Sequence, residues 1–313
     1  MIILKNIKNR KISITILTGF LGSGKTTFLN KYVSYLLNNQ EKPQVIVNEY
    51  GNLDVDSYAL GNQVEVASIL NGCVCCDSQL DLIKQLKHFI NESAMHHIII
   101  EATGIAHPIE IIAACQDPEI AEYTDVPTVI GLVDGPQFLK RKLYTNNTKD
   151  LMEEQLKVCH AIIVNKMDLI DNEAKENLKV LKELNPHAAI TYTTYTECDI
   201  EELLNEANIA TPSMTGVKYG HHHGINSLVY TFTSPIDRQL FYQFILRLPD
   251  NVLRLKGYVK FRDAPMDTYE FQYANGLPDY HVIDEAMELK IVLIGEQLDI
   301  NRLRNKLDGL QFT

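Results

Sequence analysis

The octapeptide GFLGSGKT, residues 19–26, constrains the fold of this chain more than any other stretch. It matches the pattern G-x-x-x-x-G-K-[ST], it follows the apolar run ISITIL (12–17), and a helix-length segment comes after it. A strand, a glycine-rich turn and a helix in this order form a phosphate-binding loop, in which backbone N–H groups surround the phosphates. The sequence therefore predicts a nucleotide-binding α/β domain.

Three kinds of residue in this loop are candidates for contacting a nucleotide: the glycines, the hydroxyls and the lysine. Lys25 is expected to meet the β- and γ-phosphates and to act in catalysis, and Thr26 to offer its hydroxyl to Mg²⁺. The remaining expected contacts are Gly19, Gly22, Ser23, Gly24 and Thr27. An incidental glycine turn is the alternative interpretation.

Apolar runs alternate with helix-length segments through the first two thirds of the chain. Further runs are PQVIV (43–47), HHIII (96–100), PTVIGLV (127–133), HAIIV (160–164) and AAITYT (188–193), and helices are expected at 26–39, 78–91 and 173–184. Near-continuous apolar strands separated by helices predict a parallel sheet covered on both faces. Residues 1–207 are therefore expected to form a doubly wound α/β domain.

The composition changes after residue 207. Residues 208–226 gather Pro, Gly, Ser and the triplet His221, His222 and His223, which is a linker composition. Residues 227–313 then predict a strand at 228–234, an amphipathic helix at 237–248, three more strands at 251–261, 268–273 and 288–295, and a final helix. We expect a smaller C-terminal α+β domain.

The overall composition excludes several classes of protein. The chain has 313 residues, 45% hydrophobic and 22% charged, and contains no apolar run long enough to cross a bilayer. Its net charge of −11 disfavours a nucleic-acid partner. The apolar N-terminal run leads into the glycine motif without a cleavage site, so we expect a buried strand, not a secretion signal, and a cytoplasmic protein without a membrane partner.

The tetrapeptide NKMD, residues 165–168, follows the apolar run 160–164, where a doubly wound fold places ligand-binding loops. It resembles the guanine-reading N-K-x-D of GTPases, with Asn165, Lys166 and Asp168 as the binding residues. The Asp168 carboxylate is able to accept from the ring N–H and the exocyclic amine of guanine, whereas adenine would leave it unpaired. Together with the phosphate loop, this tetrapeptide indicates a P-loop GTPase domain.

Two further segments follow strand ends. In IIIEATG (98–104), Glu101 is a candidate to orient Mg²⁺ or the attacking water, and Gly104 to donate its backbone N–H to the γ-phosphate. In VNEYGNLDVD (47–56), Glu49 is a candidate Mg²⁺ ligand in a switch loop. A solvated acidic loop is the alternative for this second segment.

Three of the six cysteines, Cys73, Cys75 and Cys76, lie within four positions beside the turn-forming pair Asn71-Gly72. Three convergent thiolates suit Zn²⁺ or Cu(I), which are selected by soft ligands. A vicinal disulfide, disfavoured in a reducing compartment, and small buried side chains are the alternatives. The histidine triplet at 221–223 is a second candidate Zn²⁺ site, or a linker feature without function.

Taken together, these motifs resemble the CobW-type family of metallochaperone GTPases, relatives of the nickel-delivery GTPases of urease and hydrogenase assembly. The resemblance covers nearly the whole chain and rests on TGFLGSGKTT, VNEYG, NGCVCC as a C-x-C-C motif, EATG, LVD (132–134), NKMD, the His-bearing linker and RLKG (254–257). Position 52 is Asn in this chain, whereas many relatives carry an acidic residue there. This difference places any metal-ligand role of position 52 in doubt.

The resemblance implies a GTP-hydrolysing metallochaperone that carries a divalent metal, Zn²⁺ or another transition ion, to a client protein. GTP, Mg²⁺ and Zn²⁺ are the expected cofactors, and a monomer or a nucleotide-dependent homodimer the expected assembly. A metal-buffering or sensing protein, in which GTP only sets metal affinity, is one alternative. A P-loop kinase of a small molecule, which would use ATP, is another.

Overall fold

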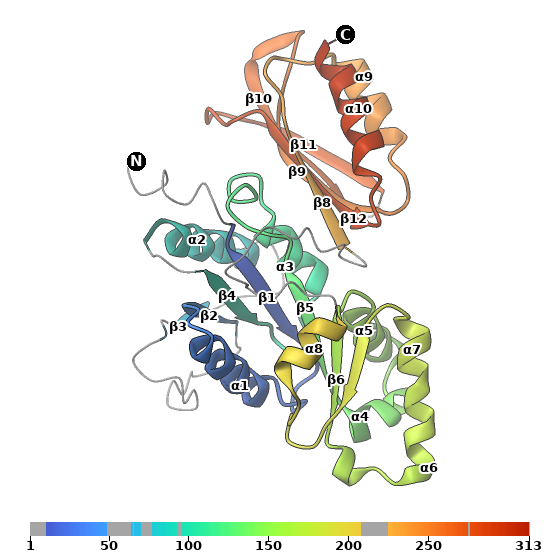
Figure 1. The fold of residues 1–313 in the computed structure, drawn as a ribbon. Helices are drawn as coiled ribbons and strands as arrows, with labels where there is room; N and C mark the ends of the chain where they lie inside the picture. Colours follow the sequence, from blue (N-terminus) through green and yellow to red (C-terminus); the bar gives the residue numbers. More distant parts are fainter. Residues whose placement is uncertain are drawn as a thin grey trace. The chain divides into compact units, whose positions relative to one another are not determined.

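The computed structural model describes residues 11–48, 64, 66–69, 77–92, 96–207, 225–274 and 276–312. The chain forms two compact units, each of which is drawn in Figure 1. The first unit comprises Met1–Ala114 and Pro127–His223, and the second comprises Cys115–Val126 and Gly224–Thr313. The second unit therefore includes a short segment that lies well before the linker in the sequence.

A seven-stranded parallel sheet forms the centre of the first unit, with the strand order β3-β2-β4-β1-β5-β6-β7. Its strands are β1 (Ser13–Thr18), β2 (Pro43–Asn48), β3 (Val66–Ile69), β4 (His97–Glu101), β5 (Thr128–Asp134), β6 (Ala161–Asn165) and β7 (Ala189–Tyr192). The central position belongs to β1, which pairs with β4 and β5. The predicted doubly wound α/β fold is confirmed.

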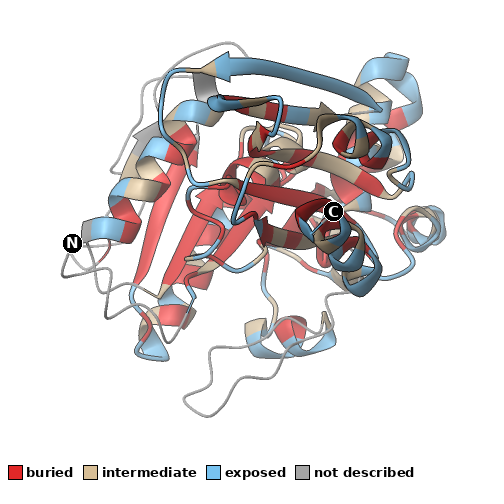
Figure 2. Cartoon of the chain, turned by 90° about the horizontal axis from the view of Figure 1, so that it is seen from above, coloured by how far each residue is buried: buried red, intermediate tan, exposed pale blue. Residues whose placement is uncertain are grey.

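The inner strands β1, β4, β5 and β6 are buried on both faces, as their apolar runs predict. Every residue of β4 and β6 is buried, and the buried residues shown in red in Figure 2 run along the strands and the inward sides of the helices. One face packs against α1 (Lys25–Asn38) and α8 (Ile200–Glu206), through residues such as Phe28 and Leu203. Continuous apolar strands are stable only when helices cover both faces.

The remaining helices of this unit vary in length from three to 16 residues, and a side chain caps the first turn of several of them. They are α2 (Asp77–Glu92), α3 (Pro108–Cys115), α4 (Gly135–Leu139), η5 (Arg141–Leu143), α5 (Asn146–Lys157), η6 (Met167–Leu169), α6 (Asn172–Lys175), η7 (Glu176–Lys179) and α7 (Val180–Leu184). Asp134, Thr145 and Asp171 accept from the backbone N–H three residues onward, as N-cap residues do. The single helix predicted at 173–184 is instead divided into three short helical pieces.

The second unit contains a five-stranded sheet with the order β11-β10-β9-β12-β8. Its elements are β8 (Ile225–Thr231), α9 (Arg238–Leu246), β9 (Val252–Phe261), β10 (Ala264–Ala274), β11 (Leu277–Ile283), β12 (Lys290–Glu296) and α10 (Ile300–Phe312). The strand pairs are antiparallel, and the two helices contribute Phe241, Phe244 and Leu307 to the core. The sequence analysis missed β11, an edge strand whose side chains are mostly exposed.

Ion pairs and hydrogen bonds hold the segment 115–126 within this second unit. Lys256 of β9 contacts Asp117 at 2.8 Å, and Lys290 of β12 contacts Glu122 at 3.1 Å. The Ser227 hydroxyl of β8 donates a 2.7 Å hydrogen bond to Gln116. Asp117 and Lys290 are both buried, so these contacts are part of the interior of the unit.

Candidate functional site

The phosphate loop lies at the carboxyl end of β1 and leads directly into α1. Gly22 and Gly24 adopt φ of 80° and 104°, a region that favours glycine. Gly19 adopts φ of 136°, and a Cβ there would meet the Leu132 carbonyl oxygen at 2.1 Å. Backbone conformation therefore requires glycine at all three positions, and close approach also requires it at Gly19 and Gly24. The sequence identified these three residues from the motif alone.

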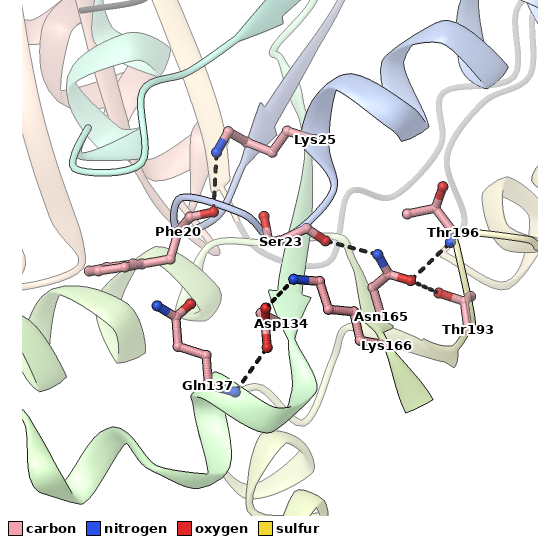
Figure 3. A network of polar contacts seen from close by, with 9 residues as sticks. All are labelled: Phe20, Ser23, Lys25, Asp134, Gln137, Asn165, Lys166, Thr193 and Thr196. Carbon is pink, nitrogen blue, oxygen red and sulfur yellow. Dashed lines mark hydrogen bonds and ion pairs between the residues drawn. The ribbon is translucent and has the colours of Figure 1, made fainter. Parts of the chain in front are cut away.

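Lys25, the first residue of α1, points back over the loop. Its Nζ donates to the Gly19 carbonyl oxygen at 2.7 Å and to the Phe20 carbonyl oxygen at 3.3 Å, and Figure 3 shows the second of these bonds. The side chain is buried, at 8% exposure. The ammonium group is thus held over the turn whose N–H groups would surround a phosphate.

Asn165, at the end of β6, joins the phosphate loop to the loop after β7, as Figure 3 shows. Its Nδ2 donates to the Ser23 carbonyl oxygen at 3.1 Å, and its Oδ1 accepts from the Thr196 backbone N–H at 2.9 Å and from the Thr193 hydroxyl at 3.3 Å. A Cβ at Gly24 would lie 2.7 Å from the same Nδ2. The two motifs that the sequence separates by 140 positions are therefore adjacent.

Lys166 has φ of 64°, which is uncommon for a residue other than glycine. Its Nζ forms a 2.6 Å ion pair with the Asp134 carboxylate. Asp134, at the end of β5, also accepts from the Gln137 N–H at 2.9 Å and so caps α4. The sequence analysis quoted LVD only as part of a resemblance and did not identify Asp134 as the partner of Lys166.

The loop after β7 is a part of the site that the sequence analysis missed. Tyr195 and Thr196 have φ of 54° and 55°, and the β-branched Thr196 is an outlier there. Besides Asn165, Lys31 of α1 holds this loop, because its Nζ donates to the Tyr195 carbonyl oxygen at 2.6 Å. This loop could have been predicted from its position, because in a doubly wound sheet the loops that follow the strands form the ligand site.

Asp168 lies in η6, beside these loops, and is exposed. Among the described residues, no hydrogen bond or ion pair involves its carboxylate. Its neighbour Leu169 is also exposed. The carboxylate is thus positioned to accept hydrogen bonds from a ligand.

Thr26 and Glu101 form the third part of the site. The Thr26 hydroxyl donates to Glu101 Oε1 at 2.9 Å, which joins the first turn of α1 to the end of β4. Glu101 is buried, at 7% exposure. A hydroxyl and a carboxylate are oxygen ligands that suit a hard cation such as Mg²⁺, so these residues fit the predicted ion.

Gly104 lies against the phosphate loop. A Cβ on this residue would meet the Leu21 backbone nitrogen at 2.8 Å and the Phe20 carbonyl carbon at 3.4 Å. The neighbouring Ala102 N–H donates to the Leu17 carbonyl oxygen at 2.9 Å, which keeps the chain beside β1. The predicted E-x-x-G residues are therefore next to the predicted phosphate loop, whereas Thr27 is exposed on α1.

Several predicted site residues lie outside the described part of the chain. They are Glu49, the cysteines Cys73, Cys75 and Cys76, and the triplet His221, His222 and His223. In the described part, no group of three or more His, Cys, Asp or Glu side chains is placed to hold a metal ion.

None of the helices in the described part has the length and apolar character needed to span a bilayer.

The other three cysteines have properties of structural thiols. Cys115 and Cys159 are fully buried, and burial raises the pKa of both thiols. Burial also raises the pKa of Cys198, which is partly exposed. Because the thiolate is the metal ligand, these three residues are poor candidates for a metal site.

Comparisons with known proteins agree with this geometry. Residues 13–192 match the family model described as CobW/HypB/UreG, nucleotide-binding domain. Residues 225–311 match the model described as the cobalamin synthesis protein cobW C-terminal domain. The first match covers more than half of the chain and includes the phosphate loop, Glu101, Gly104 and NKMD.

Two curated relatives and one solved structure are similar to this chain. The zinc-regulated GTPase metalloprotein activator 1 of Dictyostelium discoideum is 27% identical over 308 residues, which cover 82% of this chain and 64% of that protein. The zinc chaperone YjiA of Escherichia coli (strain K12) is 28% identical, with 96% of this chain and 99% of that protein covered. The crystal structure of the Zn(II)-bound YjiA GTPase from E. coli aligns with a TM-score of 0.46 at 25% identity, covering 96% and 99% of the two chains.

Proposed function

The chain belongs to the CobW/HypB/UreG family, and on that premise we propose that it is a GTP-hydrolysing metallochaperone that delivers Zn²⁺ to a client protein in a nucleotide-dependent manner. The observation that carries the nucleotide part is the contact of Asn165 with Ser23 and Gly24. This contact supports the assignment of NKMD as a base-reading tetrapeptide beside the phosphate loop. The zinc part is supported by the names of the two relatives.

In this proposal the phosphate loop binds the GTP phosphates through its backbone N–H groups, between Gly19 and Thr27. Two carbonyl oxygens hold Lys25 over the loop. When GTP binds, the ammonium group exchanges these partners for oxygens of the β- and γ-phosphates. A buried lysine interacts more strongly with phosphate than an exposed one, because water screens it less. Lys25 therefore stabilises the negative charge of the transferring group.

Base recognition is assigned to Asp168, with Asn165 and Lys166 as supporting residues. The exposed Asp168 carboxylate accepts from the N–H groups of guanine. Asn165 keeps the loops together, and the ion pair with Asp134 holds Lys166 in its left-handed conformation at the border of the base position. An adenine base would leave the carboxylate without a partner, which selects GTP over ATP.

Hydrolysis is assigned to the groups at the end of β4. Thr26 and Glu101 would hold Mg²⁺, with Glu49 as a further ligand, and the ion supplies charge neutralisation on the phosphate oxygens. Glu101 also orients the attacking water. Gly104, next to the phosphate loop, donates its backbone N–H to the γ-phosphate and so makes the end of β4 sensitive to whether GTP or GDP is bound.

The cargo site is assigned to Cys73, Cys75 and Cys76. In the sequence these cysteines lie between the last residue of β3 and the first residue of α2. Because the sheet is parallel, β3 and β4 end at the same edge, where Glu101 is located. Three thiolates leave a fourth position of a tetrahedral Zn²⁺ ion for a ligand of the client. The triplet His221–His223 is proposed as a secondary, weaker site.

The proposal is tested by the affinity for Zn²⁺ in two nucleotide states, measured by competition with a chromophoric chelator. We expect Zn²⁺ to bind at least several-fold tighter with a non-hydrolysable GTP analogue than with GDP, since coupled sites differ by roughly 5- to 150-fold. The Cys75→Ser and Cys76→Ser variants should lose this difference, and Cys198→Ser, a control thiol outside the motif, should keep it. Equal affinities in the two states would support the buffering alternative instead.

A further inference from the structure

A buried glutamine of α5 holds the segment that follows Glu101. Gln155 Nε2 donates to the Gly104 carbonyl oxygen at 3.2 Å and to the Ala106 carbonyl oxygen at 2.9 Å. The side chain is 1% exposed. One amide group therefore fixes two carbonyls that are two residues apart in the turn after β4.

The Gln155 amide lies on the inward face of α5, where a polar side chain is unusual. The buried residues of the helix are Met152, Gln155 and Leu156, so Gln155 is the polar member of an otherwise apolar face. A buried amide is unfavourable unless it is hydrogen-bonded, and the two N–H bonds of Gln155 have two acceptors here. An apolar side chain in its place would leave both carbonyls without this donor.

The same turn is restrained by its other neighbours. On one side, the backbone of Gly104 approaches Leu21 of the phosphate loop so closely that a Cβ would not fit. On the other side, Glu154, the residue that precedes Gln155 in α5, has its Oε2 atom 3.0 Å from His107 Nε2. Within the turn, the Ala106 N–H donates to the Thr103 carbonyl oxygen at 3.1 Å. The turn is thus held between the phosphate loop and α5.

We propose that Gln155 is a positioning residue for GTP, which keeps the Gly104 N–H in the conformation that reaches the γ-phosphate. This inference rests on the proposed GTPase function. The Gly104 N–H shares a planar peptide unit with the Thr103 carbonyl, which accepts from the Ala106 N–H. Gln155 holds the Gly104 and Ala106 carbonyls of the same turn and so keeps this peptide unit in place. A donor that is already in place does not lose conformational entropy when the γ-phosphate arrives. GDP has no γ-phosphate, so its binding does not depend on this restraint.

The expected effect is a change in selectivity between the two nucleotides. Replacing Gln155 should weaken the binding of a non-hydrolysable GTP analogue by about ten- to a hundredfold, because a misplaced contact of this kind has effects of that size. GDP affinity should change less than about twofold, since GDP makes no contact that depends on the turn. The kcat for GTP should fall with the affinity for the analogue.

Asn185 provides a matched control. It is also a buried amide, and its Nδ2 donates to the carbonyl oxygens of Leu156, Lys157 and Cys159 at 2.8–3.0 Å. It therefore supports the C-terminal end of α5, at the residues that follow Gln155, and these hydrogen bonds do not reach the turn. Gln155→Leu removes two donated bonds, and Asn185→Leu removes three donated and two accepted bonds. Both should lower the Tm, Asn185→Leu by more, but only Gln155→Leu should change the ratio of the two affinities.

The experiment is calorimetric titration of the full chain with the GTP analogue and with GDP, for the wild type, Gln155→Leu, Gln155→Glu and Asn185→Leu. The Gln155→Glu variant has nearly the same shape and lacks both donors when its carboxyl group is ionised. Burial beside two carbonyl oxygens raises the pKa of that carboxyl group. As the pH is lowered it takes up a proton and regains one donor, so the selectivity of this variant should be lowest at alkaline pH and partly recover toward acidic pH. A structural defect alone would not produce this recovery.

The outcomes separate the inference from the proposed function. If the Gln155 variants keep the wild-type ratio of affinities, or if Asn185→Leu changes it as much as Gln155→Leu, Gln155 has a structural role only and the inference is wrong. If the wild type neither hydrolyses GTP nor binds the analogue differently from GDP, the proposed function itself fails. The first result leaves GTP hydrolysis by the wild type intact, so the two failures are distinguishable.

Discussion

The Thr26 hydroxyl donates a 2.9 Å hydrogen bond to the Glu101 carboxylate, and this bond joins the phosphate loop to the strand beside it. Thr26 is in the first turn of α1 and Glu101 is the last residue of β4, which pairs with β1 along its whole length. The pairing of the two strands therefore brings a hydroxyl and a carboxylate together at one edge of the sheet. An ion bound there would replace the hydrogen bond with two oxygen ligands.

Glu101→Gln should reduce GTP turnover by about 10²- to 10⁴-fold, the size of effect that a positioned acid or base has. The amide keeps the shape of the side chain and still accepts from Thr26, so nucleotide binding and folding should be retained. Single-turnover phosphate release would measure the effect, with Thr26→Ser, which keeps the hydroxyl, as the control. Wild-type turnover in Glu101→Gln would show that the carboxylate is not required.

Gly104→Ala should reduce hydrolysis and the affinity for a GTP analogue, because the added Cβ would lie 2.8 Å from the Leu21 backbone nitrogen. The chain must then shift at the point where it approaches the phosphate loop. Gly309→Ala is a matched control, since a Cβ there meets nothing within 4 Å and the site is helical. That control should keep activity and gain up to about 1 kcal/mol of stability. Equal activity in the two variants would argue against the role of Gly104.

Lys25→Ala should abolish measurable hydrolysis and weaken GTP more than GDP, because the ammonium group contacts the γ-phosphate that GDP lacks. Calorimetric titration with both nucleotides would test this. Lys179→Ala, which removes a surface lysine that pairs only with Glu176 among the described residues, should leave both affinities unchanged. Equal losses of GTP and GDP affinity in Lys25→Ala would count against contact with the γ-phosphate.

Asp168→Asn should relax base selection toward xanthine nucleotides, because an amide is able to donate to the carbonyl that replaces the guanine amine. Since Asp168 is exposed, we expect a change in Tm of no more than a few degrees. Competition between GTP and XTP in a hydrolysis assay gives the ratio directly. A variant with full guanine preference would exclude Asp168 as the base-reading residue.

Lys256→Met should destabilise the second unit by about 3 kcal/mol, the lower end of the range for a broken buried ion pair. The substitution would leave the Asp117 carboxylate, which is 2% exposed, without the ammonium group that lies 2.8 Å away. The lower end of the range applies because Lys256 itself is 29% exposed. Denaturant unfolding would measure the loss. The double variant Lys256→Met with Asp117→Leu should recover part of it, because the buried Asp117 charge is then removed together with its partner.

The same unit should lose stability at alkaline pH. Burial lowers the pKa of Lys256, but the carboxylates of Asp117 and Glu270 outweigh it, and the net shift is upward from 10.5. A raised lysine pKa stabilises the fold below the unfolded-state value, and this contribution is lost as the pH rises through the folded-state value. Burial also raises the pKa of Tyr258, which acts in the same direction. The Tm should therefore fall above about pH 10, and less steeply in Lys256→Met.

Local sequence patterns predicted the elements whose structure depends on neighbouring residues. The phosphate loop follows from glycines that adopt positive φ within one turn, and the buried strands follow from apolar runs that need cover on both faces. Both β3 and β11 are edge strands and were missed, and the mostly exposed side chains of β11 carry a weak periodic signal. The single helix predicted at 173–184 consists of three short helical pieces in the structure. A periodic pattern alone does not reveal such breaks.

The sequence by itself determined the fold class, and it predicted the phosphate loop and a base-reading role for NKMD, because each depends on residue types at fixed spacing. The tertiary structure alone decided which distant residues meet: Asn165 with Ser23, Asp134 with Lys166, Gln155 with Gly104, and Asp117 with Lys256. These pairs depend on strand order and on how the helices pack over the sheet. Such arrangements arise from the burial of whole faces, which is not directional and leaves no motif in the sequence.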